Sequence, residues 1–361
     1  MRSRFADSLE GRVPRHRFTA AAALSLALVT LVAACGNDDD DGADVRNIGE
    51  ECASGSASGS ASGGGSASAS ASASASASAS GSGSASGSGA CPASGSASGS
   101  GSGIASSVQG STTDNPLIED ALTSYSTYVS DQVDETIAAT TVFTDAVRAG
   151  DLEAAKAAYA PSRQGWERIE PIAGLVEEID GAVDARVDDF AGVDDPAFTG
   201  WHRIEYILWS LDTTEGAAAF ADQLDTDLQT LKSELAGMEI PPAALAVGSS
   251  ELIEEVSTGK ITGEEDRYSG TDLWDFAANV EGSKQGFALL TPAIEEEDPE
   301  LVTSIDGLFA ELESQLAAYQ QGGGYAPYSA LTEADKTQMQ TTLAELSENL
   351  ASVAGVLGLE G

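Results

Sequence analysis

The sequence PLIEDALTSYSTYVSDQVDETIAATTVFTDAVRA, residues 116–149, indicates how the folded part of this chain is built. Its apolar residues recur at intervals of three and four, the spacing of a helix that buries one face. No strand-like alternation competes with this period, so the segment predicts one long amphipathic helix. The residues that carry the period are Leu117, Ile118, Leu122, Tyr125, Val129, Val133, Ile137, Val142 and Phe143.

The rest of residues 112–361 continues in the same way. Long stretches rich in Ala, Leu, Glu, Asp and Gln are separated by short breaks, and no persistent two-residue alternation occurs. Long helices joined by short loops predict an all-α fold, a helical bundle. The further helices are expected at 151–160, 199–211, 216–236, 242–258, 271–290, 299–320 and 330–357.

Individual residues predict where these helices begin and end. Asp151, Thr271 and Thr332 have side chains suited to cap a helix N-terminus. Pro161 lacks a backbone N–H, so we expect it to break or kink the second helix. The glycines at 322–324 are expected to end the penultimate helix.

Composition excludes whole classes of function. The chain of 361 residues has 17 Lys and Arg against 58 Asp and Glu, a net charge of −41. Nucleic-acid binding is therefore not expected, because affinity for phosphate comes from basic residues. Of the two histidines only His202 lies within 112–361, so an HExxH zinc helix is excluded there.

The N-terminus has the features of an export signal. Five arginines precede an apolar run at 18–34, and Cys35 follows small residues, so 1–34 is expected to be a signal peptide. Val32-Ala33-Ala34-Cys35 resembles a bacterial lipobox, which implies that Cys35 is lipidated. The alternative is an uncleaved membrane anchor. Either arrangement places the remainder outside the cytoplasm, in the periplasm or at the cell surface, held at the outer face of the membrane.

Residues 35–111 are expected to form a linker. An acidic run is followed by a tract of Ala, Ser and Gly at 53–103, which cannot bury enough apolar surface to offset the entropy of folding. Cys52 and Cys91 flank most of this tract and either pair or stay free. The folded domain is accordingly 112–361, about 250 residues.

Three pairs of polar residues at i, i+3 stand out in that domain. Residues at this spacing share a helix face, so each pair can direct two ligands to one point. One imidazole with several carboxylates suits iron, copper, manganese or zinc. Acidic pairs also arise by chance in so acidic a chain, and Glu251 with Glu254 is one that we interpret as solvated. The candidate pairs are Glu167 with Glu170, His202 with Glu205, and Asp272 with Asp275.

Three blocks around these pairs resemble the imelysin-like domain of the EfeO/EfeM iron-uptake lipoproteins. The first runs from Tyr159 to Ala173 and the second from Asp195 to Ser210, which holds an HxxE motif at His202 and Glu205. The third runs from Gly263 to Phe276. The likeness covers about 112–358.

The resemblance implies two four-helix-bundle lobes with a site between them that binds iron, as Fe²⁺ or Fe³⁺, with copper and zinc as alternatives. It implies a membrane iron permease and a haem peroxidase as partners. Full-length relatives carry an N-terminal cupredoxin-like domain, and here the Ala/Ser/Gly tract occupies that place. The chain therefore resembles the short, EfeM-type form. Its expected metal ligands are His202, Glu205, Glu167, Glu170, Asp275 and Asp272.

Two other functions compete with iron capture. A metallopeptidase would use His202 and Glu205, but we identify no zinc triad with a separate general base, so an enzyme is not expected. A surface protein that binds a solute or polysaccharide without metal is the third alternative.

Overall fold

The computed structural model describes residues 108 and 111–359, and within them the predicted all-α class is confirmed. The expected signal peptide, Cys35 and the Ala/Ser/Gly tract with its two cysteines lie outside the described residues. Of the helices that are described, none is both long enough and apolar enough to span a bilayer.

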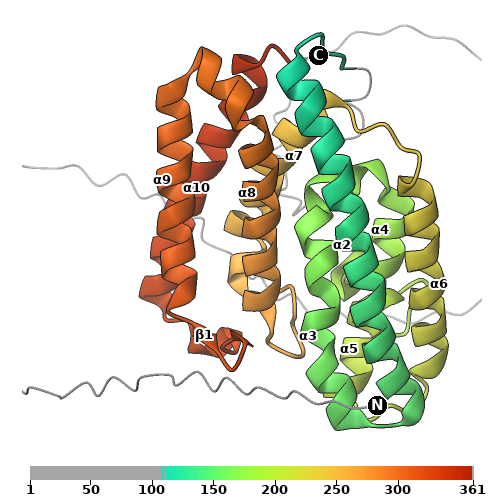
Figure 1. The fold of residues 1–361 in the computed structure, drawn as a ribbon. Coiled ribbons are helices and arrows are strands. Elements are labelled where there is room, and N and C mark those ends of the chain that lie inside the picture. Colours follow the sequence, from blue (N-terminus) through green and yellow to red (C-terminus); the bar gives the residue numbers. More distant parts are fainter. Residues whose placement is uncertain (1–107, 109–110, 360–361) are drawn as a thin grey trace, which may run out of the picture. The chain divides into compact units, whose positions relative to one another are not determined.

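The helices form two packed groups (Figure 1). In the first group the long helix α2 packs against α3 and α6, and α5 packs between α3 and α6. Its members are α2 (Pro116–Ala149), α3 (Leu152–Ile169), α4 (Glu177–Val183), α5 (Gly200–Trp209) and α6 (Ala218–Leu235). Short 3₁₀ turns, η1 (Glu170–Leu175) and η2 (Val187–Asp189), follow α3 and α4.

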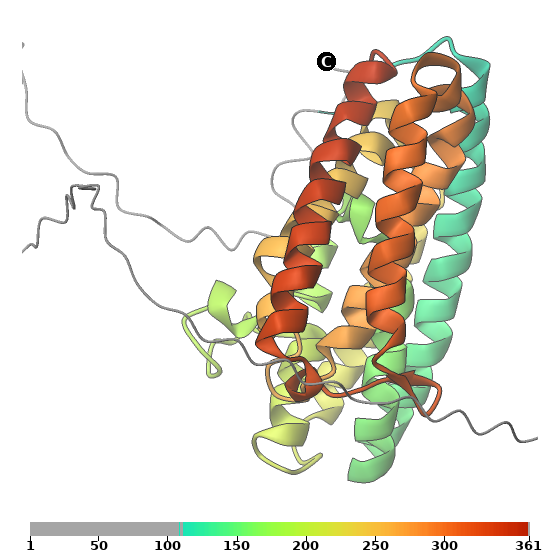
Figure 2. The ribbon, with the colours of Figure 1, turned by 90° about the vertical axis from the view of Figure 1, so that its left-hand side faces the viewer.

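The second group is a four-helix bundle, shown side-on in Figure 2. Its helices are α7 (Pro242–Thr258), α8 (Asp272–Glu297), α9 (Pro299–Ala317) and α10 (Glu333–Val356). The 3₁₀ turns η3 (Lys260–Thr262) and η4 (Tyr328–Ala330) precede α8 and α10, and a two-residue hairpin, β1 (Gln320–Gln321) with β2 (Gly324–Tyr325), follows α9.

Helix α8 lies against α3 and thereby joins the groups. The contact is close because glycines replace side chains at the crossing. A Cβ on Gly282 would lie 2.1 Å from the carbonyl oxygen of Arg168, and one on Gly248 of α7 would lie 1.8 Å from that of Pro171. These approaches hold η1, at the end of α3, between α7 and α8.

Two of the three predicted caps are confirmed. The side chain of Asp151 accepts a hydrogen bond from the Ala154 N–H, and Thr332 forms a reciprocal capping box with Asp335. Thr271 precedes α8 but makes no capping hydrogen bond. Its hydroxyl instead donates to the Asp266 carboxylate.

Pro161 was expected to break or kink the second helix, and the break is wrong, since α3 continues through it to Ile169. One backbone hydrogen bond is lost, but the residues on both sides are buried and hold the helix in place, Tyr159 and Ala160 before it and Ser162 and Arg163 after it. Similarly, α8 extends past Pro292 to Glu297, and α9 ends at Ala317, before the glycines. Gly322 and Gly323 form the hairpin turn, and Gly324 begins β2.

Candidate metal site

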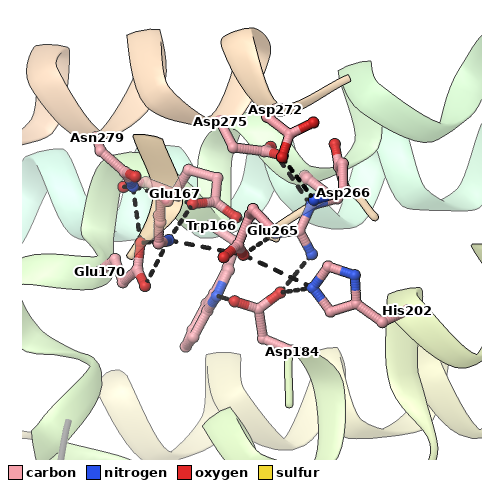
Figure 3. A network of polar contacts seen from close by, with 12 residues as sticks. Trp166, Glu167, Glu170, Asp184, His202, Glu265, Asp266, Asp272, Asp275 and Asn279 are labelled. Carbon is pink, nitrogen blue, oxygen red and sulfur yellow. Dashed lines mark hydrogen bonds and ion pairs between the residues drawn. The ribbon is translucent and has the colours of Figure 1, made fainter. Parts of the chain in front are cut away.

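A cluster of buried charged groups lies where the two helix groups meet. Helices α3 and α5 contribute from one group, and α8 with the segment before it contributes from the other (Figure 3). Every acidic or basic residue discussed below as part of this cluster is at most 9% exposed. Buried charges require partners or metal, so each of them has to be accounted for.

His202 lies at the centre of the candidate site. Its Nδ1 is 3.3 Å from Oε2 of Glu205 and 3.3 Å from the hydroxyl of Tyr159. Its Nε2 has no hydrogen-bond partner in the described structure, although Oδ1 of Asp184 and Oε1 of Glu265 each lie 3.6 Å away. Nε2 therefore faces the carboxylates of Asp184 and Glu265 at a distance longer than a hydrogen bond.

Glu205 is held by backbone amides from the other helix group. Its Oε1 accepts hydrogen bonds from the N–H groups of Tyr268 at 2.9 Å and Ser269 at 2.7 Å. Its second oxygen is left to face His202. Tyr159 supports this arrangement, because its hydroxyl donates to Oδ1 of Asp266 at 2.8 Å beside the imidazole.

These positions give two overlapping sets of metal-ligand atoms. His202 with Asp184 and Glu265 forms one set, and His202 with Glu205 and Asp266 forms the other; within each set the atoms lie within 4.8 Å of one another. A small pocket lined by His202, Glu205 and Glu265 has a volume of about 10 Å³. That is about the space of one water molecule, and Arg186 and Arg267 also line the pocket.

The expected ligands Glu167 and Glu170 lie in a neighbouring part of the cluster. The Lys260 ammonium is 3.0 Å from Oε2 of Glu167 and 2.7 Å from Oε2 of Glu170. The amide of Asn279 donates to the same two oxygens, at 2.9 and 2.7 Å. The structure thus pairs these carboxylates with an internal cation and does not group them with His202.

Asp272 and Asp275 occupy a third position, at the start of α8 (Figure 3). Oδ1 of Asp275 accepts a hydrogen bond from Nε of Arg163 at 3.3 Å, and Oδ1 of Asp272 accepts one from the Asp266 N–H at 3.2 Å. The other oxygen of each is buried without a hydrogen-bond partner in the described residues. Both side chains border the His202 region, and neither belongs to the two ligand sets.

Arg163 links these parts from α3. Its guanidinium, fully buried, bonds to Asp184 and Glu167 and reaches Oε1 of Glu265 at 2.9 Å. Asp184 is also fixed by the indole N–H of Trp166 at 3.0 Å. Arg163 therefore orients two carboxylates that face Nε2 of His202.

The electrostatics follow from this burial. Burial and the Arg163 charge lower the pKa of His202, but the adjacent carboxylates of Glu205, Glu265 and Asp184 outweigh them and raise it to about 9. Burial opposes ionisation of Glu265, but Lys260 and Arg186 outweigh it and hold its pKa well below the usual range. Without metal, these directions favour an imidazolium that faces the ionised carboxylate of Glu265.

Several residues of the cluster were not found from sequence. Glu265 and Asp266 lie in an acidic run, and the i, i+3 rule does not identify residues in a loop. Asp184 follows α4 with no motif around it. Arg163 and Lys260 are cationic and do not bind metal ions, so the spacing of metal-ligating residues does not identify them. Of the six expected ligands, the structure joins His202 and Glu205 directly.

Comparison with known proteins agrees with this architecture. Residues 121–353 match the family described as imelysin, peptidase M75. The chain is 46% identical over 241 residues to the "Iron uptake system component EfeO" of Escherichia coli strain K12, of E. coli O157:H7 and of Shigella flexneri. The match covers 66% of this chain and 64% of each relative's length. Because the family match spans well over half of the chain, the protein belongs to the imelysin family.

Proposed function

We propose that this protein is an iron-binding component of an iron-uptake system, with iron as its cargo. His202 would bind the ion either through Nε2 with Asp184 and Glu265 or through Nδ1 with Glu205 and Asp266. The observation that carries the proposal is the buried Nε2 of His202, which has no hydrogen-bond partner in the described structure and lies 3.6 Å from each of two carboxylate oxygens. A metal ion in that gap would replace the proton of the imidazolium.

The donor set supports iron over a soft metal. It offers carboxylate oxygens with one imidazole nitrogen and no sulfur, which suits iron, manganese or zinc and disfavours Cu(I). Zinc and Cu(II) remain as outcomes of the binding test. The relatives named EfeO support the choice of iron, because their name describes an iron-uptake component.

We further propose an exported, lipid-anchored protein that passes iron to a membrane permease, with a haem peroxidase as a second partner. The lipobox-like Val32-Ala33-Ala34-Cys35 supports the anchor, and the low-complexity segment 35–111 would let the 112–361 domain reach a membrane partner. The short, EfeM-type organisation is part of the same proposal.

Metal titration of the full chain tests the function. Iron binding is measured by calorimetry and by metal content after gel filtration, for the wild-type protein and for His202→Ala. Glu313→Gln is the matched surface control, since Glu313 is half exposed and, within residues 111–359, forms an ion pair only with Lys284. About one iron per wild-type chain, its loss in His202→Ala and its retention in the control are expected. Equal binding by His202→Ala would overturn the proposal.

Peptidase activity is the second candidate, favoured only by the family description. It would need a water activated by metal and a separate general base beside His202. Glu205, Glu265 and Asp266 each have at least one oxygen held by backbone amides, Arg163, Arg186 or Tyr159, and we assign none of them as the general base. Hydrolysis of casein that chelator abolishes and added metal restores would favour the peptidase.

A further inference from the structure

The segment 261–270, which leads from η3 to α8, carries two of the candidate metal ligands. Glu265 and Asp266 lie in its middle, and each belongs to one of the two ligand sets around His202. Two backbone N–H groups of the same segment hold Oε1 of Glu205. Whatever fixes this segment therefore fixes ligands of both sets.

Tyr328 of η4 holds both ends of this segment. Its hydroxyl donates to the carbonyl oxygen of Ile261 at 3.1 Å, and its backbone N–H donates to that of Gly270 at 2.9 Å. The two ends therefore lie within the reach of one tyrosine, and the residues between them form a compact loop whose ends are close together. Because one residue joins both ends, it restricts the conformations that residues 262–269 can adopt.

The ring of Tyr328 also packs on the loop. Gly263 has φ +86°, and a Cβ there would lie 2.3 Å from Cε1 of the ring, so only glycine allows this approach. The Lys336 ammonium of α10 lies 4.5 Å from the centre of the same ring. Tyr328 comes from the connection between α9 and α10, which lies at the end of the bundle where α8 begins (Figure 1). The contact therefore ties the ligand-bearing loop to a part of the chain 67 residues from Ile261.

We propose that Tyr328 is a positioning residue of the metal site. By clasping both ends of the 261–270 segment, it holds Glu265 and Asp266 at their distances from His202. It acts through the loop backbone and supplies no ligand of its own. The proposal rests on the proposed function in so far as these carboxylates bind iron.

Tyr328→Phe tests the clasp, because it removes the hydroxyl and keeps the ring and the backbone N–H. We expect Fe²⁺ affinity, measured by anaerobic calorimetry on the full chain, to fall about 10-fold, since loss of an outer partner weakens a metal site by about 10–100-fold. The electron paramagnetic resonance spectrum of bound Mn²⁺ should also change, because its line shape depends on ligand geometry. In the metal-free chain, hydrogen exchange should become faster at residues 262–269 and stay unchanged in α2.

Tyr325→Phe is the matched control. It makes the same chemical change in the same connection, where the Tyr325 hydroxyl accepts a hydrogen bond from the Gln320 amide at 3.3 Å. Affinity, spectrum and exchange should stay at their wild-type values. If Tyr328→Phe binds Fe²⁺ as tightly as Tyr325→Phe does, the proposal is wrong, even where exchange in the loop has become faster.

Two glycines test the clasp from the side of the loop. Gly263→Ala places a Cβ against the Tyr328 ring, whereas Gly270→Ala, with φ +69°, places one where no atom lies within 4 Å. Both variants carry backbone strain, so the difference between them reports on the ring contact. We expect Gly263→Ala to weaken Fe²⁺ binding more than Gly270→Ala, and Tyr328→Leu to abolish that difference. Equal affinities of the two Ala variants, or a difference that persists with Leu at 328, would refute the ring contact.

Failure of the proposed function is recognised separately. A wild-type chain that binds no Fe²⁺ refutes that function, and exchange in the metal-free chains then decides the clasp by itself. Faster exchange at residues 262–269 in Tyr328→Phe but not in Tyr325→Phe supports the clasp. Equal exchange in the two variants means that Tyr328 does not hold the loop.

Discussion

Oε2 of Glu205 lies 3.3 Å from Nδ1 of His202, while Oε1 of the same carboxylate is held by the amides of Tyr268 and Ser269. One oxygen is therefore structural and the other is available to a metal. A glutamine at 205 can keep its carbonyl oxygen on the two amides and place its NH₂ group toward His202. This one substitution therefore removes the oxygen that would bind metal and keeps the hydrogen bonds to the two backbone amides.

We expect Glu205→Gln to retain wild-type helicity and a thermal transition within a few degrees of wild type. Metal affinity should fall by about 100-fold or more, because even loss of an outer partner weakens a metal site by about 10–100-fold. Circular dichroism and iron calorimetry measure the two effects. Unchanged affinity would show that Glu205 serves only to hold residues 268–269 in place.

Tyr159 is expected to act as a positioning residue. Its hydroxyl donates to Asp266 and lies 3.3 Å from His202, so Tyr159→Phe removes an outer contact and leaves the ring packing intact. We expect iron affinity to fall about 10-fold or more, with a stability loss of about 1 kcal/mol.

Tyr125→Phe is the matched control. The Tyr125 hydroxyl is also fully buried but has no hydrogen-bond partner in the described structure. Removing it should leave affinity unchanged and stability equal to or higher than wild type. Equal affinity in both Phe variants would remove Tyr159 from the site.

Gly200 sets the position of α5 and hence of His202. It has φ +73°, and a Cβ there would lie 2.1 Å from the carbonyl oxygen of Val183. Gly200→Ala should destabilise the protein by several kcal/mol and lower metal affinity, because α5 must move away from α4. Gly216→Ala is the control, because Gly216 also has a positive φ, +84°, but an added Cβ would meet no atom within 4 Å. It tests the backbone strain without the close contact and should lower stability by only about 1–2 kcal/mol. Equal losses in urea denaturation would refute the close-contact argument.

Lipidation of Cys35 is tested by Cys35→Ser in a bacterial host. Replacement of the lipidated residue should move the protein from the membrane to the soluble extracytoplasmic fraction, because the acyl chains that would hold it at the membrane are lost. Fractionation and immunoblotting measure the change. A variant that stays in the membrane would identify the apolar run at 18–34 as the anchor.

The fold was accessible from sequence because helical periodicity is local. Residues 116–149 show their buried face directly, and Asp151 and Thr332 signal helix starts through contacts within four residues. The failure at Pro161 has a tertiary cause. Tyr159 and Arg163 flank Pro161 and are buried. Tyr159 contacts Asp266 and Arg163 contacts Asp275, each more than 100 residues away, and these contacts keep the helix intact.

The site was accessible only in part for the same reason. His202 and Glu205 are one turn apart, so their spacing reveals the pair. Lys260 lies 90 residues from Glu170 and Glu265 lies 102 from Arg163, and no local rule predicts such partners. Glu167 and Glu170 have the spacing of ligands, but which cation they hold depends on the chain packed against them.

The last prediction concerns pH, where protein stability and metal affinity should change in opposite directions. His202 has its pKa raised to about 9 from an unfolded value of 6.5, so its stabilising contribution is full below 6.5 and is lost as pH rises to 9. Burial raises the pKa of Asp180 to about 8, so the folded state also holds that proton more tightly than the unfolded state and loses stability over about pH 4–8. The metal-free protein should therefore unfold at lower urea concentration at pH 9 than at pH 6.5.

Iron, by contrast, must displace the imidazolium proton, so its affinity should rise over the same range and about one proton should be released per ion at pH 7.5. Calorimetry in buffers of different ionisation enthalpy counts that proton. Because iron hydrolyses at high pH, Mn²⁺ serves as the probe above pH 8. His202→Ala should show a shallower fall of stability between pH 7 and 9. Metal binding without proton release would mean that His202 is neutral in the free protein, and its pairing with the surrounding carboxylates would then have to be weaker than the geometry indicates.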